Sequence, residues 1–249
     1  ANIRETQKRR SFLAYSERER AVPWRAFPCY ISWYELNINS NNAAPGSEYN
    51  NFTAEDIEAV MNVWKTNFYD KYGVAPAAFV IDDGWDNYGP WTFHSGFPNG
   101  MQGMSAIAKD MGSGIGAWLG PVGGYGQSGN YRRAYWSDKG GMQLSNPAYY
   151  EAYLKAANNL VCKQDGVDGF DRNTDNYLFF KFDGISAKFS AVGPDDGDTG
   201  NENAEGIIRL EQYVREELRE DIFFNTSVGT WASPFWYQIT DATWRQEND

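Results

Sequence analysis

The sequence predicts an α/β protein of the TIM-type barrel class, (β/α)8, of which roughly the first six β/α units are present. Two observations lead to this prediction. Short apolar and aromatic stretches alternate with stretches in which apolar residues recur at helical spacing. Several of the apolar stretches end in carboxylates, glycine or proline, which is typical of barrel strands that open into loops. Because six strands would leave unpaired edges, we expect the sequence to be a segment of a longer polypeptide.

The first part of the chain is expected to supply a leading segment, one strand and one helix. Residues 1–26 are polar and charged without a clear period, which favours a lead-in linker or helix before a partial barrel over residues 27–249. Phe27 to Tyr34 is aromatic and β-branched and predicts the first strand. Thr53 with Asp56 forms an N-terminal capping signal, behind which apolar residues recur at helical spacing.

The second and third strands are predicted at two short apolar runs. Ala77 to Ile81 is the first run, and two aspartates follow it directly. Apolar residues between positions 104 and 111 indicate a short helix, and Ile115 to Leu119 predicts the third strand. The glycine-rich segment Val122 to Asn130 is expected to be a long loop on the same rim as the two aspartates.

The remaining units follow the same alternation. Asn146 before Pro147 predicts the start of a helix with an apolar stripe. Leu178 to Ile185 predicts the fourth strand, and a helix is expected over residues 207–218. The fifth and sixth strands are predicted at Ile222 to Phe224 and at Asp241 to Asp249.

The fourth strand is the stretch around which the rest of the prediction is arranged. Successive side chains of a strand point to opposite faces, so Phe180 and Phe182 share an apolar face while Lys181 and Asp183 share a charged one. In a barrel the charged pair would lie at the mouth of the lumen. On this strand alone, a buried structural ion pair and an active-site pair remain equally good interpretations.

The sixth predicted strand shows a similar alternation of polar and apolar residues. Its polar positions are Asp241, Thr243, Arg245, Glu247 and Asp249. Ala242 and Trp244 lie between them, so we expect the polar row to face the lumen. Charged rows on two strands, with the acidic pair after the second strand, exceed what a packed core requires and favour an active site.

The composition narrows the class of function. A net charge of −11 makes nucleic acid a poor partner, and no apolar run reaches the roughly 18 to 20 residues that span a bilayer. Two distant cysteines, Cys29 and Cys162, offer no metal cluster or redox pair, and the single histidine, His94, argues against a histidine-based triad. The 33 acidic residues and 10 tryptophans instead supply carboxylates for proton transfer and aromatic faces for sugar rings.

Five motifs together resemble the α-galactosidase and α-N-acetylgalactosaminidase family of glycoside hydrolases, the melibiase-like enzymes. They are Phe179 to Gly184, Val80 to Trp85, Phe97 to Met101 with Gly112 to Trp118, Trp244 to Asp249, and Ser32-Trp33. The family's usual Gly-Trp before the last of these is here Tyr30-Ile31. The resemblance covers the chain from about Phe27 to its end, and the motifs occur in the family's order.

The resemblance implies that Asp183 is the nucleophile and Asp249 the general acid/base of a retaining glycosidase. One carboxylate must attack the anomeric carbon while the other, protonated, gives its proton to the leaving oxygen, and such a pair stands about 5 to 5.5 Å apart. Glu247 shares a strand face with Asp249 and remains an alternative acid.

The resemblance also implies a set of substrate-binding residues. Asp82 and Asp83 would accept hydrogen bonds from the 4- and 6-hydroxyls of the sugar, and Lys181 would contact the 3- and 4-hydroxyls. Arg245 would reach the 2-position, whereas Trp33 and Trp118 would line the pocket. In the family, residues after the fifth strand distinguish galactose from N-acetylgalactosamine, and Ser227, with Thr230, is the candidate for that role here.

We therefore expect residues 27–249 to be a catalytic barrel that removes terminal α-galactosyl residues without a metal or organic cofactor. The expected partner is a carbohydrate substrate, with neither nucleic acid nor membrane involved and the oligomeric state left open. An α-N-acetylgalactosaminidase, a β-L-arabinopyranosidase and a transglycosylase are alternatives on the same scaffold. From another class, a barrel that binds carbohydrate without cleaving it is also possible.

Overall fold

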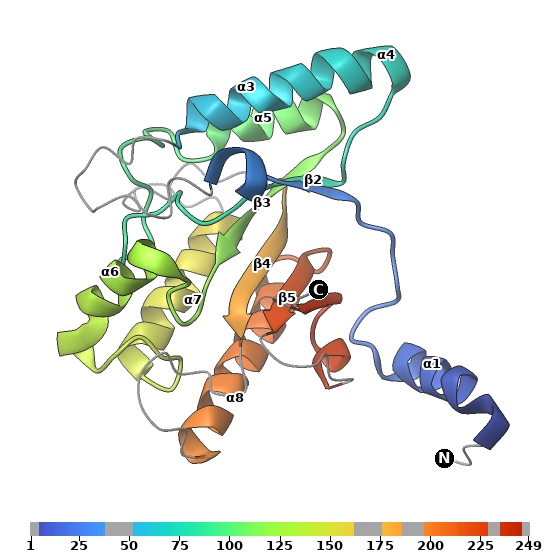
Figure 1. The fold of residues 1–249 in the computed structure, drawn as a ribbon, viewed down its shortest axis with the longest axis vertical. Coiled ribbons are helices and arrows are strands. Elements are labelled where there is room, and N and C mark those ends of the chain that lie inside the picture. Colours follow the sequence, from blue (N-terminus) through green and yellow to red (C-terminus); the bar gives the residue numbers. More distant parts are fainter. Residues whose placement is uncertain (1–4, 38–51, 162–175, 186–196, 229–234, 246–249) are drawn as a thin grey trace.

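The computed structural model describes residues 5–37, 52–161, 176–185, 197–228 and 235–245 (Figure 1). Within these ranges the chain forms one six-stranded sheet in which every strand is parallel to its neighbour and the spatial order follows the sequence. The strands are β1 (Cys29–Ile31), β2 (Ala78–Ile81), β3 (Gly114–Leu119), β4 (Tyr177–Ile185), β5 (Phe223–Val228) and β6 (Ala242–Arg245).

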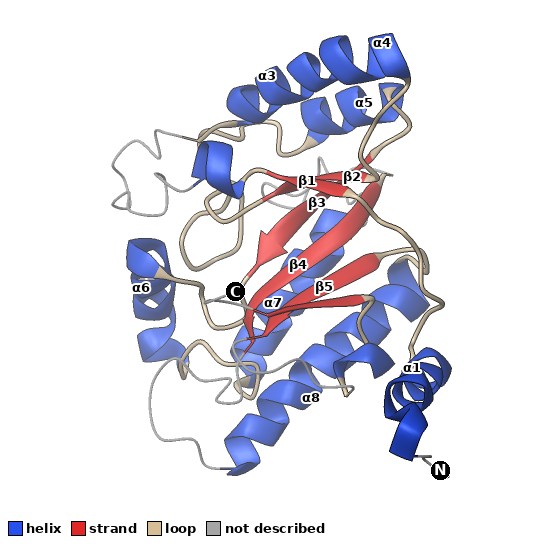
Figure 2. Cartoon of the chain, turned by 45° about the vertical axis from the view of Figure 1, so that its right-hand side comes forward, coloured by secondary structure: helices blue, strands red, loops and turns tan. Residues whose placement is uncertain are grey.

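Helices connect the strands. They are α1 (Lys8–Glu19), α3 (Ala54–Trp64), α4 (Asp70–Tyr72), α5 (Gln102–Asp110), α6 (Gly126–Trp136), α7 (Pro147–Val161) and α8 (Gly197–Tyr213). Wider π-type turns follow α3 at Lys65–Tyr69 and α8 at Val214–Leu218. Helices α3 and α5 flank the β1 to β3 side of the sheet and α7 and α8 the β4 to β5 side, while α1 projects away (Figure 2).

The sheet curls into half of a parallel barrel, which is the arrangement predicted for the first six units (Figures 1 and 2). The described strands do not close on themselves, so the total of eight stays a prediction. Several predicted helix starts are also confirmed. Thr53 and Asp56 form a reciprocal capping box at α3, and the Asn146 side chain accepts a hydrogen bond from the Ala148 backbone at the start of α7.

The two faces of the sheet pack differently. On the outer face, Phe180 and Phe182 of β4 join the main hydrophobic core together with residues of the flanking helices. On the inner face, a smaller cluster of Ala78, Val80, Phe179 and Phe223 fills the floor of the half-barrel, and Phe27 stacks on it. Charged side chains lie farther along the same inner face, beyond this apolar floor.

A glycine on β3 allows this floor to pack tightly. An added Cβ atom at Gly116 would stand 2.5 Å from both the Cβ and the carbonyl oxygen of Phe179 on the neighbouring strand. That spacing is far inside van der Waals contact, and one of the two atoms belongs to backbone that cannot move away cheaply. The strand therefore needs a residue without a side chain here.

The sequence prediction was wrong for the segment after β3. Val122 to Asn130 was expected to be a loop, but helix α6 begins at Gly126 within it. The buried face of α6 carries Ser128, Arg132 and Trp136 at four-residue spacing. Because that face is largely polar, the segment lacks the apolar periodicity by which amphipathic helices are recognised.

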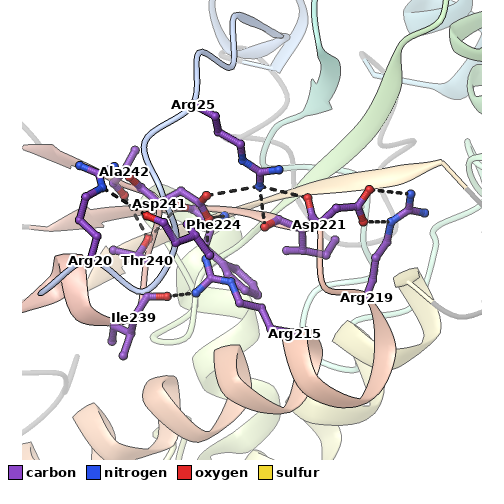
Figure 3. Close-up of polar contacts among 12 residues, drawn as sticks. Arg20, Arg25, Arg215, Arg219, Asp221, Phe224, Ile239, Thr240, Asp241 and Ala242 are labelled. Carbon is purple, nitrogen blue, oxygen red and sulfur yellow. Dashed lines mark hydrogen bonds and ion pairs between the residues drawn. The ribbon is translucent and has the colours of Figure 1, made fainter. Parts of the chain in front are cut away.

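The predicted orientation of the sixth strand was also wrong. Ala242 packs on the inner apolar cluster, and the Nζ atom of Lys181 lies 5.2 Å from the centre of the Trp244 ring. Asp241 points the other way, where its Oδ2 atom contacts the Arg215 guanidinium at 2.5 Å and accepts a hydrogen bond from the Phe224 backbone (Figure 3). The alternation was read correctly, but an alternating pattern does not reveal which set faces inward.

Candidate active site

Five of the predicted site residues come together at the carboxyl ends of three adjacent parallel strands. Asp82 and Asp83 directly follow β2, and Trp118 is the penultimate residue of β3. Lys181 is the central residue of β4, and Asp183 lies two positions nearer its carboxyl end. Strand pairing places Lys181 opposite Trp118. Parallel strands end at the same rim of a barrel, which is where active sites of this fold are built.

Each carboxylate oxygen of Asp183 accepts a hydrogen bond. The indole Nε1–H of Trp118 donates to Oδ2 at 2.9 Å, and the backbone N–H of Gly184 donates to Oδ1 at 2.9 Å. Gly184 has φ +76°, a conformation that residues with a side chain rarely adopt. Asp183 is buried, so these donors fix the direction of a negative charge that has little water around it.

Lys181 forms a buried ion pair with Asp82. Its Nζ atom lies 2.8 Å from Oδ2 of Asp82, and both side chains are largely out of contact with solvent. Burial alone would lower the pKa of Lys181, but the carboxylates of Asp82 and Asp183 outweigh it and raise that pKa. Burial raises the pKa of Asp82, an effect that Lys181 only partly offsets.

Backbone hydrogen bonds tie Asp82 to the neighbouring strand and to Asp83. The backbone N–H of Asp82 donates to the Ser32 hydroxyl oxygen at 3.0 Å, and the backbone N–H of Asp83 donates to Oδ1 of Asp82 at 2.8 Å. Both oxygens of Asp82 are thus engaged, one by Lys181 and one by Asp83. Its geometry is fixed before any ligand arrives.

Sequence reasoning missed Arg132, which stands at the back of this group. Its guanidinium contacts Oδ1 of Asp83 at 2.5 Å and both oxygens of Asp86, at 2.5 and 3.0 Å. Burial would lower the pKa of Arg132, but the two carboxylates outweigh it and the net direction is upward. Burial raises the pKa of Asp86 to about 6, against the opposing effect of Arg132. The four-residue spacing of Ser128, Arg132 and Trp136 was the signal that could have revealed it.

The fifth strand adds a second residue that the sequence reasoning missed. Asn225 pairs with Lys181 in the strand register, and its buried Oδ1 atom has no hydrogen-bond partner among the described residues. Ser227, the predicted specificity residue, lies two positions farther on and is also buried. Both positions alternate with the outer-face residues Phe224 and Thr226, so they share the inner face of β5.

The remaining predicted site residues lie outside this group or outside the described part of the structure. Trp33 is half-buried in a helical turn, Trp33–Asn37, that follows β1. Arg245 ends β6, but its side chain is outside the described part of the structure. The candidate acids Asp249 and Glu247, together with Thr230, also lie outside the described residues.

The described residues also show how His94 is packed and whether metal-ligand clusters or membrane-spanning helices occur among them. His94 is buried edge-on against Phe97, and burial lowers its pKa to about 4, which suits a neutral packing residue. Within the described ranges, no cluster of three or more histidine, cysteine or acidic side chains is arranged to hold a metal ion. Within the same ranges, no helix combines the length and the apolar character needed to cross a bilayer.

Comparison with known proteins identifies solved structures with a similar fold. One similar structure is a variant of the family 36 α-galactosidase AgaA from Geobacillus stearothermophilus, in complex with 1-deoxygalactonojirimycin. It matches this chain with a TM-score of 0.60 and 15% sequence identity. The alignment covers 94% of this chain and 33% of that one. The α-galactosidase TtGalA from Thermus thermophilus, with p-nitrophenyl α-D-galactopyranoside, matches at 0.57 and 16% identity, covering 94% of this chain and 44% of that one.

A further AgaA variant, solved with stachyose, matches at a TM-score of 0.56 and 14% identity over 90% of this chain and 31% of that one. The chain thus spans less than half the length of these structures, and at such identities the likeness establishes the fold alone. No family model matches the sequence, and no curated protein matches it. The comparison supports a likeness to family 36 α-galactosidase structures and not the narrower melibiase-like assignment.

Proposed function

We propose that this chain carries the nucleophile side of a retaining glycoside hydrolase that removes terminal α-galactosyl residues. Asp183 is the proposed nucleophile. The observation that carries the proposal is the position of Asp183: it lies at the carboxyl end of a barrel strand, buried, with a donor on each oxygen and a lysine–carboxylate pair beside it. A structural ion pair would not require two further donors directed at a neighbouring carboxylate.

The proposed reaction has two steps. In the first, an oxygen of Asp183 attacks the anomeric carbon while the general acid gives its proton to the departing glycosidic oxygen. In the second, water attacks the glycosyl–enzyme bond, the same acid now accepts the proton of that water, and Asp183 leaves as a carboxylate. Asp249 is the proposed acid/base, with Glu247 as the alternative. Two inversions at the same carbon retain its configuration.

Asp82 and Lys181 are proposed to bind the hydroxyl groups of the sugar. Lys181 keeps two ammonium protons beyond the one directed at Asp82, and each carboxylate oxygen of Asp82 keeps a further lone pair. Two adjacent groups of opposite character can recognise neighbouring hydroxyls that donate to one and accept from the other. Asn225, Ser227 and Trp33 are proposed to complete the pocket around them.

The choice of galactose rests on the solved structures of similar fold. Two of them hold 1-deoxygalactonojirimycin and p-nitrophenyl α-D-galactopyranoside, and a third holds stachyose. α-N-Acetylgalactosaminide and β-L-arabinopyranoside cleavage, and transfer to a sugar acceptor, are alternatives that product analysis on the matching substrates separates. Binding without cleavage is the alternative outside enzymes.

The proposal is tested by removing the nucleophile and supplying a substitute. Asp183→Gly should lower turnover of an aryl α-galactoside by at least about a thousand-fold, because the covalent intermediate cannot form. Added azide should then restore activity and give β-galactosyl azide, the product of a single inversion. Asp110→Asn, at an exposed aspartate on α5, serves as the matched control and should retain full activity.

Full hydrolytic activity in Asp183→Gly would contradict the proposal. Absence of cleavage by the unaltered protein, combined with saturable galactose binding, would instead favour the carbohydrate-binding alternative.

A further inference from the structure

We propose that Arg132 is a positioning residue, which holds the candidate nucleophile and the neighbouring carboxylate pair in their working geometry. The inference rests on the proposed function, since it assigns Arg132 to the same site. Arg132 is fully buried on α6, and its guanidinium contacts Asp83, Asp86 and the Trp118 ring. Two separate sets of contacts lead from it to Asp183 and to Lys181.

The first set of contacts leads to Asp183 through Trp118. The guanidinium carbon of Arg132 lies 4.8 Å from the centre of the Trp118 ring, a cation–π distance, and the same indole donates its N–H to Asp183. The edge of the ring is closed by backbone, because an added Cβ at Gly124 would stand 2.6 Å from the Cη2 atom of Trp118. Arg132 and the backbone at Gly124 together hold the indole in place, which fixes the direction of its N–H bond.

The second set leads to Lys181 through the two adjacent aspartates. Arg132 contacts Asp83, whose backbone N–H donates to Oδ1 of Asp82, and Asp82 in turn pairs with Lys181. A displacement of Asp83 would therefore shift the backbone donor that orients Asp82. One cation thus supports both the nucleophile and the proposed hydroxyl-binding pair.

The fork of the guanidinium is itself held from three sides. Asp86 binds Nε and Nη2, and Nη1 donates to the carbonyl oxygen of Gly123 at 2.9 Å. Tyr88 and Trp91 lie over it at 5.1 Å each. A packing role alone would be served as well by an apolar side chain, since burying charges is costly. Directional contacts in three directions match what preorganisation of a site requires.

The direct test follows the indole N–H of Trp118 by NMR in protein labelled at tryptophan nitrogen. Arg132→Lys keeps the positive charge but loses the planar fork. We expect it to shift the Trp118 resonance, identified by its loss in Trp118→Phe, and to speed its hydrogen exchange by about ten-fold or more. The indole of Trp64, which donates to Val74 far from the site, should keep its resonance.

Asp86→Asn provides the same test with a smaller disturbance. It weakens the support of Arg132 without altering Trp118 or Asp183, so it should move the Trp118 resonance in the same direction even where Arg132→Lys does not fold. Unchanged resonance and exchange for Trp118 in the folded variants would overturn the inference. The NMR measurement needs no catalytic activity, so it tests the positioning role of Arg132 whether or not α-galactosides are substrates.

Steady-state kinetics on a substrate that the protein cleaves distinguish a positioning role of Arg132 from a general loss of protein stability. We expect Arg132→Lys to lower kcat/KM about a hundred-fold and Trp118→Phe about ten-fold. The double variant should be close to Arg132→Lys alone, because Arg132→Lys already removes the support that passes through Trp118. Arg209→Lys, at an arginine stacked on Tyr150 of α7, is the matched control and should leave kcat/KM unchanged. Multiplicative effects in the double variant would contradict a route through Trp118.

Discussion

At the scale of single residues, the site depends on how buried charges are shared. Lys181 neutralises Asp82, Arg132 neutralises Asp83 and Asp86, and Asp183 receives neutral donors from Trp118 and Gly184. The Asp183 carboxylate, the proposed nucleophile, accepts one hydrogen bond from an indole N–H and one from a backbone N–H. These donors stabilise its negative charge and hold its oxygens in place, which suits a group that must attack carbon.

Lys181→Met should be costly for catalysis. It leaves Asp82 buried without its cation and removes the proposed donor to the sugar, so kcat/KM should fall about a hundred-fold or more. Steady-state kinetics on an aryl α-galactoside measure this. Lys109→Met, at an exposed lysine on α5, should retain full activity. Equal activity in the two variants would exclude Lys181 from the site.

His94 should make stability depend on pH. Burial lowers its pKa from 6.5 to about 4, so the unfolded chain binds a proton more readily than the folded one between these values. The contribution of His94 to the free energy of unfolding is complete above about pH 6.5 and is lost as the pH falls towards 4. Between these pH values the free energy of unfolding of His94→Gln should therefore fall less than that of the unaltered protein, by on the order of 1 kcal/mol. Urea unfolding at both ends of the interval checks this, and parallel pH profiles would contradict it.

At the scale of elements, a local signal in the sequence determines where helix α3 begins. The Thr53 hydroxyl oxygen accepts from the Asp56 backbone while the Asp56 side chain accepts from the Thr53 backbone. Thr53→Ala should therefore cost about 1 kcal/mol of unfolding free energy. Thr66→Ala, at an exposed position of the turn after α3, should change it by less than about 0.5 kcal/mol. Denaturant unfolding compares the two, and equal costs would contradict the capping role.

Asp241 should hold the segment before β1 against the last strands. Its carboxylate contacts Arg215 at 2.5 Å and Arg25 at 3.3 Å, and its backbone carbonyl accepts from Arg20 (Figure 3). Asp241→Asn removes the negative charge that Arg215 and Arg25 contact. It should lower the free energy of unfolding by about 2 to 3 kcal/mol and speed proteolysis near Arg25. Asp221→Asn, at an exposed pair with Arg219, should cost less than about 1 kcal/mol. A smaller loss for Asp241 than for Asp221 would contradict this role.

The elements also show what could be predicted from the sequence. The two faces of β4 were predicted correctly, because Phe180 and Phe182 alternate with Lys181 and Asp183, which separates an apolar face from a charged one. The inward face of β6 was predicted wrongly, because Asp241 has its partner on a helix residue, Arg215, that is remote in sequence. Helix α6 was missed because its buried face carries the polar Ser128 and the ion-paired Arg132 beside Trp136, so the segment has no apolar stripe.

At the scale of the whole molecule, parallel order brings residues from distant parts of the chain to one rim. Asp82, Trp118 and Asp183 come from three strands that are successive in the sheet. The order of strands was predictable from the alternation of elements, and with it the meeting of these residues. The contacts of Arg132 behind these residues were not predictable, because Asp83 after β2 and Gly123 after β3 meet Arg132 of α6 only in the folded chain.

The apolar floor and the charged rim divide the half-barrel into two layers. Phe27, Phe179 and Phe223 fill the inner face near the amino ends of the strands, whereas Lys181 and Asp183 lie towards the carboxyl ends. A packed floor under a polar rim is the layout expected when the fold supports a site at one end. On β4, Phe179 then contributes to the stability of the fold, whereas Lys181 and Asp183 contribute to the proposed chemistry.

The most direct test of the central claim is to treat the protein with a mechanism-based galactose analogue that forms a stable ester with a catalytic nucleophile, and to map the modified residue by mass spectrometry. We predict one label per chain, on the peptide that contains Asp183, with competition by free galactose and no label in Asp183→Asn. A label on another carboxylate, or labelling that persists in Asp183→Asn, would contradict it.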